Sequence, residues 1–166
     1  MSKMTAILGH PDRLKKLAAD IVQHYETLCD EKPEIVQKAM IVCADRKLAL
    51  RVLKEILKLR PDWGVAKKCE DESSVPAEDL EQMTEIPKIN LVATRNPDDE
   101  KELFDLCGTK EYRQKLDQLF KDTKSNFKIA IVVDMWITGF DVPSLAVMYI
   151  DKPLQKHTLI QTISRV

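Results

Sequence analysis

Short apolar runs alternate with amphipathic stretches along the whole chain. Four runs have the length of a buried strand, and they cover residues 39–43, 89–93, 129–133 and 145–150. Apolar residues recur at three- and four-residue intervals, as on one face of a helix, over about residues 11–28, 46–59 and 110–121. Parallel strands need connections long enough to hold a helix. The alternation therefore predicts an α/β domain with a mainly parallel sheet and helices on both faces.

Proline, glycine and acidic residues mark the ends of several predicted helices. Pro11 suits the first turn of a helix, and Asn96-Pro97 marks a turn. Asp98 to Glu100 would place negative charge on the first turn of a further helix, which Gly108 would end. Residues 158–166 predict the start of a last helix, and because no stop signal follows, we expect the chain to be a fragment of a larger protein.

Residues 64–88 fit neither the strand nor the helix pattern. This stretch is acidic and polar, contains Pro76 and Pro87, and has no sustained period. We interpret it as a long acidic excursion from a single domain that spans residues 1–166.

Composition limits the class of protein without deciding its function. The chain has 26 basic and 27 acidic residues, so a nucleic-acid contact requires a local basic cluster. Its four cysteines lack metal-ligand spacing and follow no secretion signal, which favours reduced, mostly buried thiols. No apolar run approaches the ~20 residues that span a bilayer, so we expect a cytoplasmic protein with no membrane partner.

The histidines and tryptophans give little indication of chemistry. The three histidines are dispersed, which favours structural or surface roles over a metal site or a catalytic triad, and we expect no bound metal. Trp63 and Trp136 are expected to pack in the interior. The alternative for Trp136 is a position near DNA.

Polar segments follow each of the four predicted strands. In open α/β sheets, ligands bind at the carboxyl ends of the strands, so these segments are the candidate site. They are Ala44-Asp45-Arg46, Thr94-Arg95-Asn96, Asp134 to Pro143, and Asp151-Lys152-Pro153. Polar loops occur at this edge in any such sheet, so their position alone does not establish a function.

The segment Thr138-Gly139-Phe140-Asp141-Val142-Pro143 has the residue types of a nucleotide or phosphate contact. Gly139 would let the backbone approach a phosphate, Thr138 could donate to it, and Asp141 could accept from a ribose hydroxyl or orient an arginine. The alternative is a simple turn that Gly139 and Pro143 shape and Asp141 caps.

Gln161 and Arg165 form a second polar pair. On the predicted last helix they would lie one turn apart and share a face, from which they could reach a nucleotide or phosphate. The alternative is a solvated helix start.

Three segments resemble known helicase motifs. KAMIVCADRK, FKIAIVVDMWITGFDVPSLAVMYIDKPL and HTLIQTISRV are similar to motifs IV, V and VI in the form found in the R (restriction) subunits of type I restriction-modification enzymes, which belong to helicase superfamily 2. The similarity covers nearly the whole chain. It implies the RecA-like fold of P-loop NTPases and, within it, the second lobe of an ATP-driven DNA motor.

The resemblance also implies roles for individual residues. Gly139 and Asp141 would belong to the nucleotide side of motif V, and Gln161 and Arg165 to motif VI in the ATP cleft. The residues expected on the DNA side are Thr138, Thr94 and Arg95.

The implied enzyme is an ATP-dependent type I site-specific deoxyribonuclease that uses ATP and Mg²⁺. Its partners would be double-stranded DNA, the first RecA-like domain and nuclease domain of the same subunit, and the modification and specificity subunits. This chain has no Gly-x-x-x-x-Gly-Lys-Ser/Thr loop and no Asp-Glu pair for magnesium, so we expect it to bind no cofactor and to be inactive alone.

Two other classes of protein remain open. One is a stand-alone α/β interaction or regulatory domain that keeps the motor fold without ATPase activity. The other is a nucleotide-binding enzyme of the flavodoxin or Rossmann type, which the absence of a glycine-rich turn after the first strand disfavours.

Overall fold

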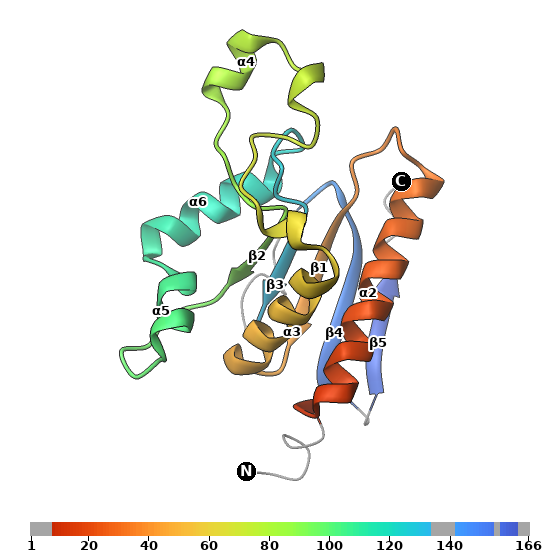
Figure 1. Ribbon diagram of the computed structural model, residues 1–166, viewed down its shortest axis with the longest axis vertical. Coiled ribbons are helices and arrows are strands. Elements are labelled where there is room, and N and C mark those ends of the chain that lie inside the picture. Colours follow the sequence, from red (N-terminus) through yellow and green to blue (C-terminus); the bar gives the residue numbers. More distant parts are fainter. Residues whose placement is uncertain (1–7, 134–141, 155–156, 163–166) are drawn as a thin grey trace.

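A five-stranded sheet forms the centre of the molecule. The computed structural model describes residues 8–133, 142–154 and 157–162. The strands are β1 (Lys38–Cys43), β2 (Ile89–Val92), β3 (Ile129–Val132), β4 (Leu145–Leu154) and β5 (His157–Thr162). Their order is β2-β3-β1-β4-β5 (Figure 1). Strands β1 to β4 are parallel, and β5 pairs antiparallel with β4. The chain thus has the predicted α/β class with a mainly parallel sheet, consistent with a RecA-like domain.

Helices cover both faces of this sheet, as the alternation of apolar runs predicts. The longer helices are α2 (Pro11–Glu31), α3 (Arg46–Leu59) and α6 (Lys110–Lys121), and α5 (Lys101–Cys107) is a shorter one. In Figure 1, α2 and α3 lie in front of the sheet, while α6 lies beside β2. Alternate residues of β1 point to opposite faces, so Ile41 packs in the same cluster as residues of α2 and α3, and Met40 packs with α6.

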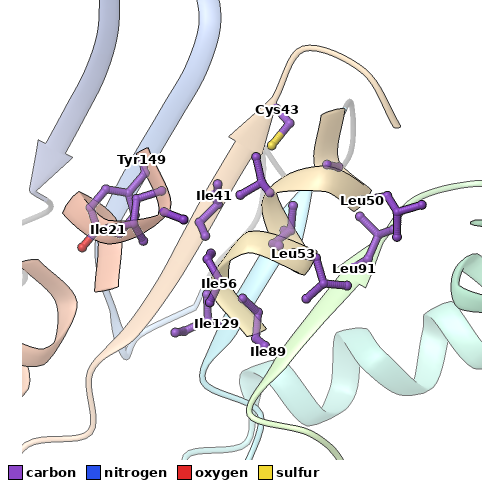
Figure 2. Packing of buried hydrophobic residues seen from close by; sticks show 14 of the residues in the cluster. Ile21, Ile41, Cys43, Leu50, Leu53, Ile56, Ile89, Leu91, Ile129 and Tyr149 are labelled. Carbon is purple, nitrogen blue, oxygen red and sulfur yellow. The ribbon is translucent and has the colours of Figure 1, made fainter. Parts of the chain in front are cut away.

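The larger of the two hydrophobic clusters joins α2 and α3 to four strands. Figure 2 shows Ile21 of α2 and Leu53 and Ile56 of α3 against Ile41 and Tyr149 of the sheet. All five side chains are at least nine-tenths buried. Each buried side chain of this size contributes roughly 1.5–3 kcal/mol to folding, so this cluster fixes α2 and α3 on the sheet.

The excursion of residues 64–88 stands away from the sheet at the amino ends of its strands (Figure 1). It follows the 3-10 helix η1 (Pro61–Gly64) and contains the 3-10 helix η2 (Glu72–Ser74) and the helix α4 (Ala77–Gln82). An antiparallel bridge between Lys67 and Ile86 closes its base. Neither η2 nor α4 has a buried residue. The prediction of an excursion is therefore confirmed, although it has more helical structure than the sequence pattern indicates.

The predicted last helix is wrong, because residues 157–162 form β5. Met148 of β4 pairs with Gln161, and Tyr149 pairs with Ile160. Thr158, Ile160 and Thr162 alternate along this segment, and β-branched residues at a period of two favour a strand. Pairing with β5 also carries β4 beyond the predicted end at residue 150, to Leu154.

The acidic residues before α5 also lie elsewhere than predicted. Asp98 and Asp99 precede the helix, Glu100 is its N-cap, and Glu102 is the acidic residue of its first turn. Gly108 ends α5, as predicted.

The expected burial of two residue types is confirmed within the described ranges. The side chain of Trp63 is 4% exposed and packs edge-on against Tyr25. The cysteines are free thiols, of which Cys43, Cys69 and Cys107 are buried and Cys29 is half-buried. None of the helices in the described residues is both long and apolar enough to cross a membrane.

Candidate nucleotide and DNA edge

The carboxyl ends of the parallel strands bring several charged residues to one edge of the sheet. Asp45 and Arg46 follow β1, Thr94 and Arg95 follow β2, and Asp151 lies within β4 opposite the last residue of β1. The strand order is β2-β3-β1-β4, so the ends of β2, β1 and β4 lie along the same edge. Among the described residues, the topology therefore gathers three of the four predicted site segments at one edge.

Arg46 joins the segment after β1 to the segment after β2. Asp45 caps α3 by accepting a hydrogen bond from the backbone N–H of Leu48 at 2.8 Å. The next residue, Arg46, forms an ion pair with Asp99 and donates from Nη1 to the backbone carbonyl of Thr94 at 3.0 Å. The guanidinium of Arg46 lowers the pKa of Asp99, and the carboxylate raises the pKa of Arg46. This ion pair and hydrogen bond hold the two segments in a fixed relation.

Thr94 and Arg95, both predicted on the DNA side, lie at this edge in different environments. Thr94 is exposed to solvent, whereas Arg95 is half-buried. The guanidinium carbon of Arg95 lies 4.0 Å from the centroid of the Phe104 ring, and its Nε donates to the carbonyl of Gly108 at 2.5 Å. The Arg95 side chain is therefore held in one orientation before any ligand is present.

Arg113 lies beside Arg95, a neighbour that the sequence pattern does not reveal. It follows the N-cap Thr109 in the first turns of α6, and its Nη1 donates to the same Gly108 carbonyl at 3.1 Å. The sequence signal that could have found it is an arginine five residues after a helix-ending glycine, but the carbonyl that it shares with Arg95 is brought to both by the tertiary fold.

An ion pair between α2 and β4 closes the opposite side of this edge. Arg13 pairs with Asp151, whose side chain is 1% exposed, and Arg13 also donates to the carbonyl of Leu8 at 2.8 Å. Burial raises the pKa of the neighbouring Cys43 thiol, and the negative charge of Asp151 raises it further. Cys43 is therefore a buried thiol that packs at this edge in its neutral form.

Most of the residues assigned to ATP by the resemblance lie outside the described part of the chain, namely Gly139, Asp141 and Arg165. Thr138, expected on the DNA side, and Trp136 also lie outside the described residues. The backbone of Gln161 lies in β5, so the proposed arrangement of Gln161 on a helix face is wrong. Among the described residues, no group of three or more His, Cys, Asp or Glu side chains could hold a metal ion.

Comparison with known proteins identifies a family model that matches part of this chain and relatives that match nearly all of it. Residues 66–166 match the model of a family described as "Type I restriction enzyme subunit R domain 3". The chain is 34% identical over 161 residues to the "Type I restriction enzyme HindI endonuclease subunit" of Haemophilus influenzae. The aligned residues make up 96% of this chain and 13% of that relative.

Two archaeal relatives cover the chain equally well. The "Putative type I restriction enzyme MjaIXP endonuclease subunit" of Methanocaldococcus jannaschii is 34% identical over 99% of this chain, and the MjaVIIP subunit of the same organism is 31% identical over 99%. The chain spans 13–14% of the length of these relatives. The family match covers more than half of the chain, and we conclude that this chain belongs to the family of domain 3 of type I restriction enzyme R subunits.

Proposed function

We propose that this chain is the second motor lobe of an ATP-dependent DNA translocase within a type I restriction endonuclease R subunit. In this proposal it contributes motifs IV, V and VI to a cleft that the first RecA-like lobe completes. The full subunit would act as an ATP-dependent type I site-specific deoxyribonuclease in the cytoplasm. It would work with a nuclease domain, the modification and specificity subunits, and double-stranded DNA.

The observation that carries the proposal is the position of the motif segments in the family-matched sheet. The motif IV segment contains β1 and the Asp45-Arg46 turn, and the motif V segment contains β3 and β4. These three strands are neighbours in the order β3-β1-β4. Ligands of open α/β sheets bind where such strands end. The resemblance and the topology therefore favour the same edge.

The chain would supply only part of an ATP site. It lacks a phosphate-binding loop and an Asp-Glu pair for magnesium, so these groups would come from the first lobe. We assign Gly139 and Asp141 to the nucleotide, and Gln161 and Arg165 to the phosphate side of the cleft. Hydrolysis of ATP, assisted by Mg²⁺, would supply the driving force, while this chain would orient the nucleotide and hold DNA through Thr138, Thr94 and Arg95.

The proposal is tested in an intact R subunit that contains this domain. We expect Asp141→Ala and Arg165→Ala each to lower DNA-stimulated ATPase activity by ~10-fold or more, because both groups would act on the charge in the nucleotide site. Arg51→Ala is the matched control, because Arg51 is exposed on α3. Unchanged ATPase activity in the two site variants would contradict the proposal and favour a stand-alone interaction or regulatory domain.

A further inference from the structure

Two arginines from different elements bind one backbone carbonyl at the corner between α5 and α6. Arg95 approaches from the segment after β2, and Arg113 approaches from α6. Their nitrogens lie 2.5 and 3.1 Å from the carbonyl oxygen of Gly108. Both side chains are half-buried, so part of each remains open to solvent.

The positive charge of this pair has no carboxylate partner among the described residues. By contrast, Arg13, Arg46 and Arg60 form ion pairs with Asp151, Asp99 and Glu26. A carbonyl oxygen accepts hydrogen bonds but carries no net charge, so two guanidinium groups that share it repel each other. An anion bound between Arg95 and Arg113 would remove this repulsion.

The backbone conformation at the corner explains why the two arginines meet. Gly108 has a φ of 66°, and a Cβ at this position would lie 2.4 Å from Cδ1 of Tyr112. A side chain is therefore excluded both by backbone conformation and by space. The glycine turns the chain from α5 into α6 and leaves its carbonyl as the acceptor for both guanidinium groups.

The first turn of α6 adds further positive potential. Thr109 caps this helix by accepting a hydrogen bond from the backbone N–H of Tyr112 at 3.1 Å. The amino end of a helix carries a partial positive charge that favours anions. Lys110 lies at the first position of the helix, and Glu111 beside it is the opposing carboxylate, exposed to solvent.

We propose that Arg95, Arg113 and the first turn of α6 bind a phosphate group of the DNA backbone. The planar fork of each guanidinium matches the oxygens of a phosphate, and the Phe104 ring and the Gly108 carbonyl hold the forks in place. The site lies beyond β2, the edge strand of the sheet. Gly139 and Asp141, which we assign to the nucleotide, follow β3 in the chain, and Gln161 lies in β5 at the opposite edge of the sheet, which favours DNA over ATP as the source of the phosphate.

This inference rests on the proposed function, and its test uses binding of the 166-residue chain to a short fluorescent DNA duplex over a series of salt concentrations. The logarithm of the affinity falls linearly as the logarithm of the salt concentration rises, and each phosphate contact makes this slope steeper by about 0.9. We expect Arg95→Ala and Arg113→Ala each to weaken binding several-fold at about 20 mM salt, and the double variant, which leaves the phosphate without a guanidinium partner, to reduce that slope by about 1.

Two further variants separate the effect of charge from the effect of guanidinium geometry. Arg51→Ala removes the same charge from an exposed position on α3, and we expect it to leave the slope unchanged. Arg113→Lys keeps the charge without the planar fork, and we expect weaker binding with an unchanged slope. Circular dichroism and thermal unfolding of each variant confirm that the fold is intact.

The results distinguish failure of this site from failure of the proposed function. If the wild-type chain binds the duplex and Arg113→Ala behaves as Arg51→Ala does, the arginine site is wrong and the DNA-binding function stands. If the wild-type chain shows no binding even at about 20 mM salt, DNA contact through this edge is wrong altogether.

A second measurement identifies the source of the phosphate. Backbone amide NMR shifts of residues 108–113 are followed while either the duplex or inorganic phosphate is added. Shifts at these residues with the duplex at micromolar concentration support the DNA backbone. Shifts with inorganic phosphate alone, and none with the duplex, would overturn the assignment to DNA.

Discussion

Lys38 is a fully buried lysine at the first position of β1. Its Nζ donates to the backbone carbonyls of Leu119, Phe120 and Asp122 at 3.3, 2.5 and 2.7 Å. The last carbonyls of a helix have no partner within the helix, so the ammonium group satisfies acceptors at the end of α6. Burial, and then the positive charge of Lys128, lower the pKa of Lys38 to about 7.

This lowered pKa predicts a specific dependence of stability on pH. The unfolded chain holds the Lys38 proton up to its ordinary pKa of 10.5, while the folded chain releases it above about 7. Between these values the unfolded state binds more protons, so the free energy of unfolding should rise with pH, by at most about 1.4 kcal/mol per pH unit. Below about pH 7 both states are protonated, and Lys38 adds no pH dependence.

Urea denaturation of wild-type protein and Lys38→Met at several pH values between about 6 and 10 tests this prediction. Lys38→Met should lose the part of the rise in the free energy of unfolding that Lys38 contributes, because methionine fills a similar volume and does not titrate. Lys15→Met, at an exposed position of α2, should keep it. If the free energy of unfolding changes with pH in the same way in the wild type and in Lys38→Met, burial does not lower the pKa of Lys38.

At the scale of elements, the ion pair between Arg13 and Asp151 ties α2 to β4. Asp151 is almost fully buried, and the Arg13 side chain is 24% exposed. We expect Arg13→Ala to lower the free energy of unfolding by about 3 kcal/mol, because it removes a cation that pairs with a buried carboxylate.

The matched control for Arg13→Ala is Lys54→Ala. Lys54 pairs with Glu102 at 2.8 Å, but both side chains are about half exposed. Water screens such a pair, so this control should cost less than about 1 kcal/mol. Equal losses in the two variants, measured by chemical denaturation, would mean that the bond between α2 and β4 contributes no more than a surface pair.

Local patterns predicted most of the elements, because the information that defines them lies within a few residues. The bounds of α3 and α6 agree with the apolar periodicity, and Asp45 and Thr109 cap these two helices. The prediction of a helix over residues 158–166 takes no account of the alternating β-branched residues in this segment. Its pairing with β4 is a tertiary contact, which local periodicity does not encode.

The candidate site was less predictable than the fold for the same reason. Topology was sufficient to place Thr94 and Arg95 at the carboxyl edge. The contact of Arg46 with Asp99 spans 53 positions of the chain, and Arg95 and Arg113 share the Gly108 carbonyl only because the corner between α5 and α6 folds back beside the segment after β2. Such pairings depend on how helices pack, so a single sequence does not reveal them.

At the scale of the whole molecule, the net charge of −1 conceals a concentration of negative charge in the excursion. The excursion of residues 64–88 has seven acidic and three basic side chains and stands at the amino ends of the strands (Figure 1). The paired arginines Arg95 and Arg113 lie toward the carboxyl ends. Under the proposed function, the acidic excursion would repel DNA from the amino edge of the sheet and so favour contact at the carboxyl edge, where Arg95 and Arg113 lie.

The negative charge of the excursion predicts how stability and DNA affinity change when residues 71–84 are replaced by a short Gly-Asn turn. The replacement keeps the Lys67–Ile86 bridge and the buried side chains of Cys69 and Ile86, and it removes η2 and α4, which have no buried residues. We expect the free energy of unfolding to change by less than about 1 kcal/mol, because loop length has only a weak effect on closure entropy. DNA affinity at low salt should increase, because five acidic residues are lost.

A full-length control separates the charge of the excursion from its structure. In this control the same five acidic residues become their amides: Asp71, Glu72, Glu78, Asp79 and Glu81. If the excursion acts only through charge, both variants gain DNA affinity equally and unfold with the cooperativity of the wild type. Loss of cooperative unfolding in the shortened chain alone would show instead that the sheet depends on the excursion for its stability, since the amide variant retains every backbone contact.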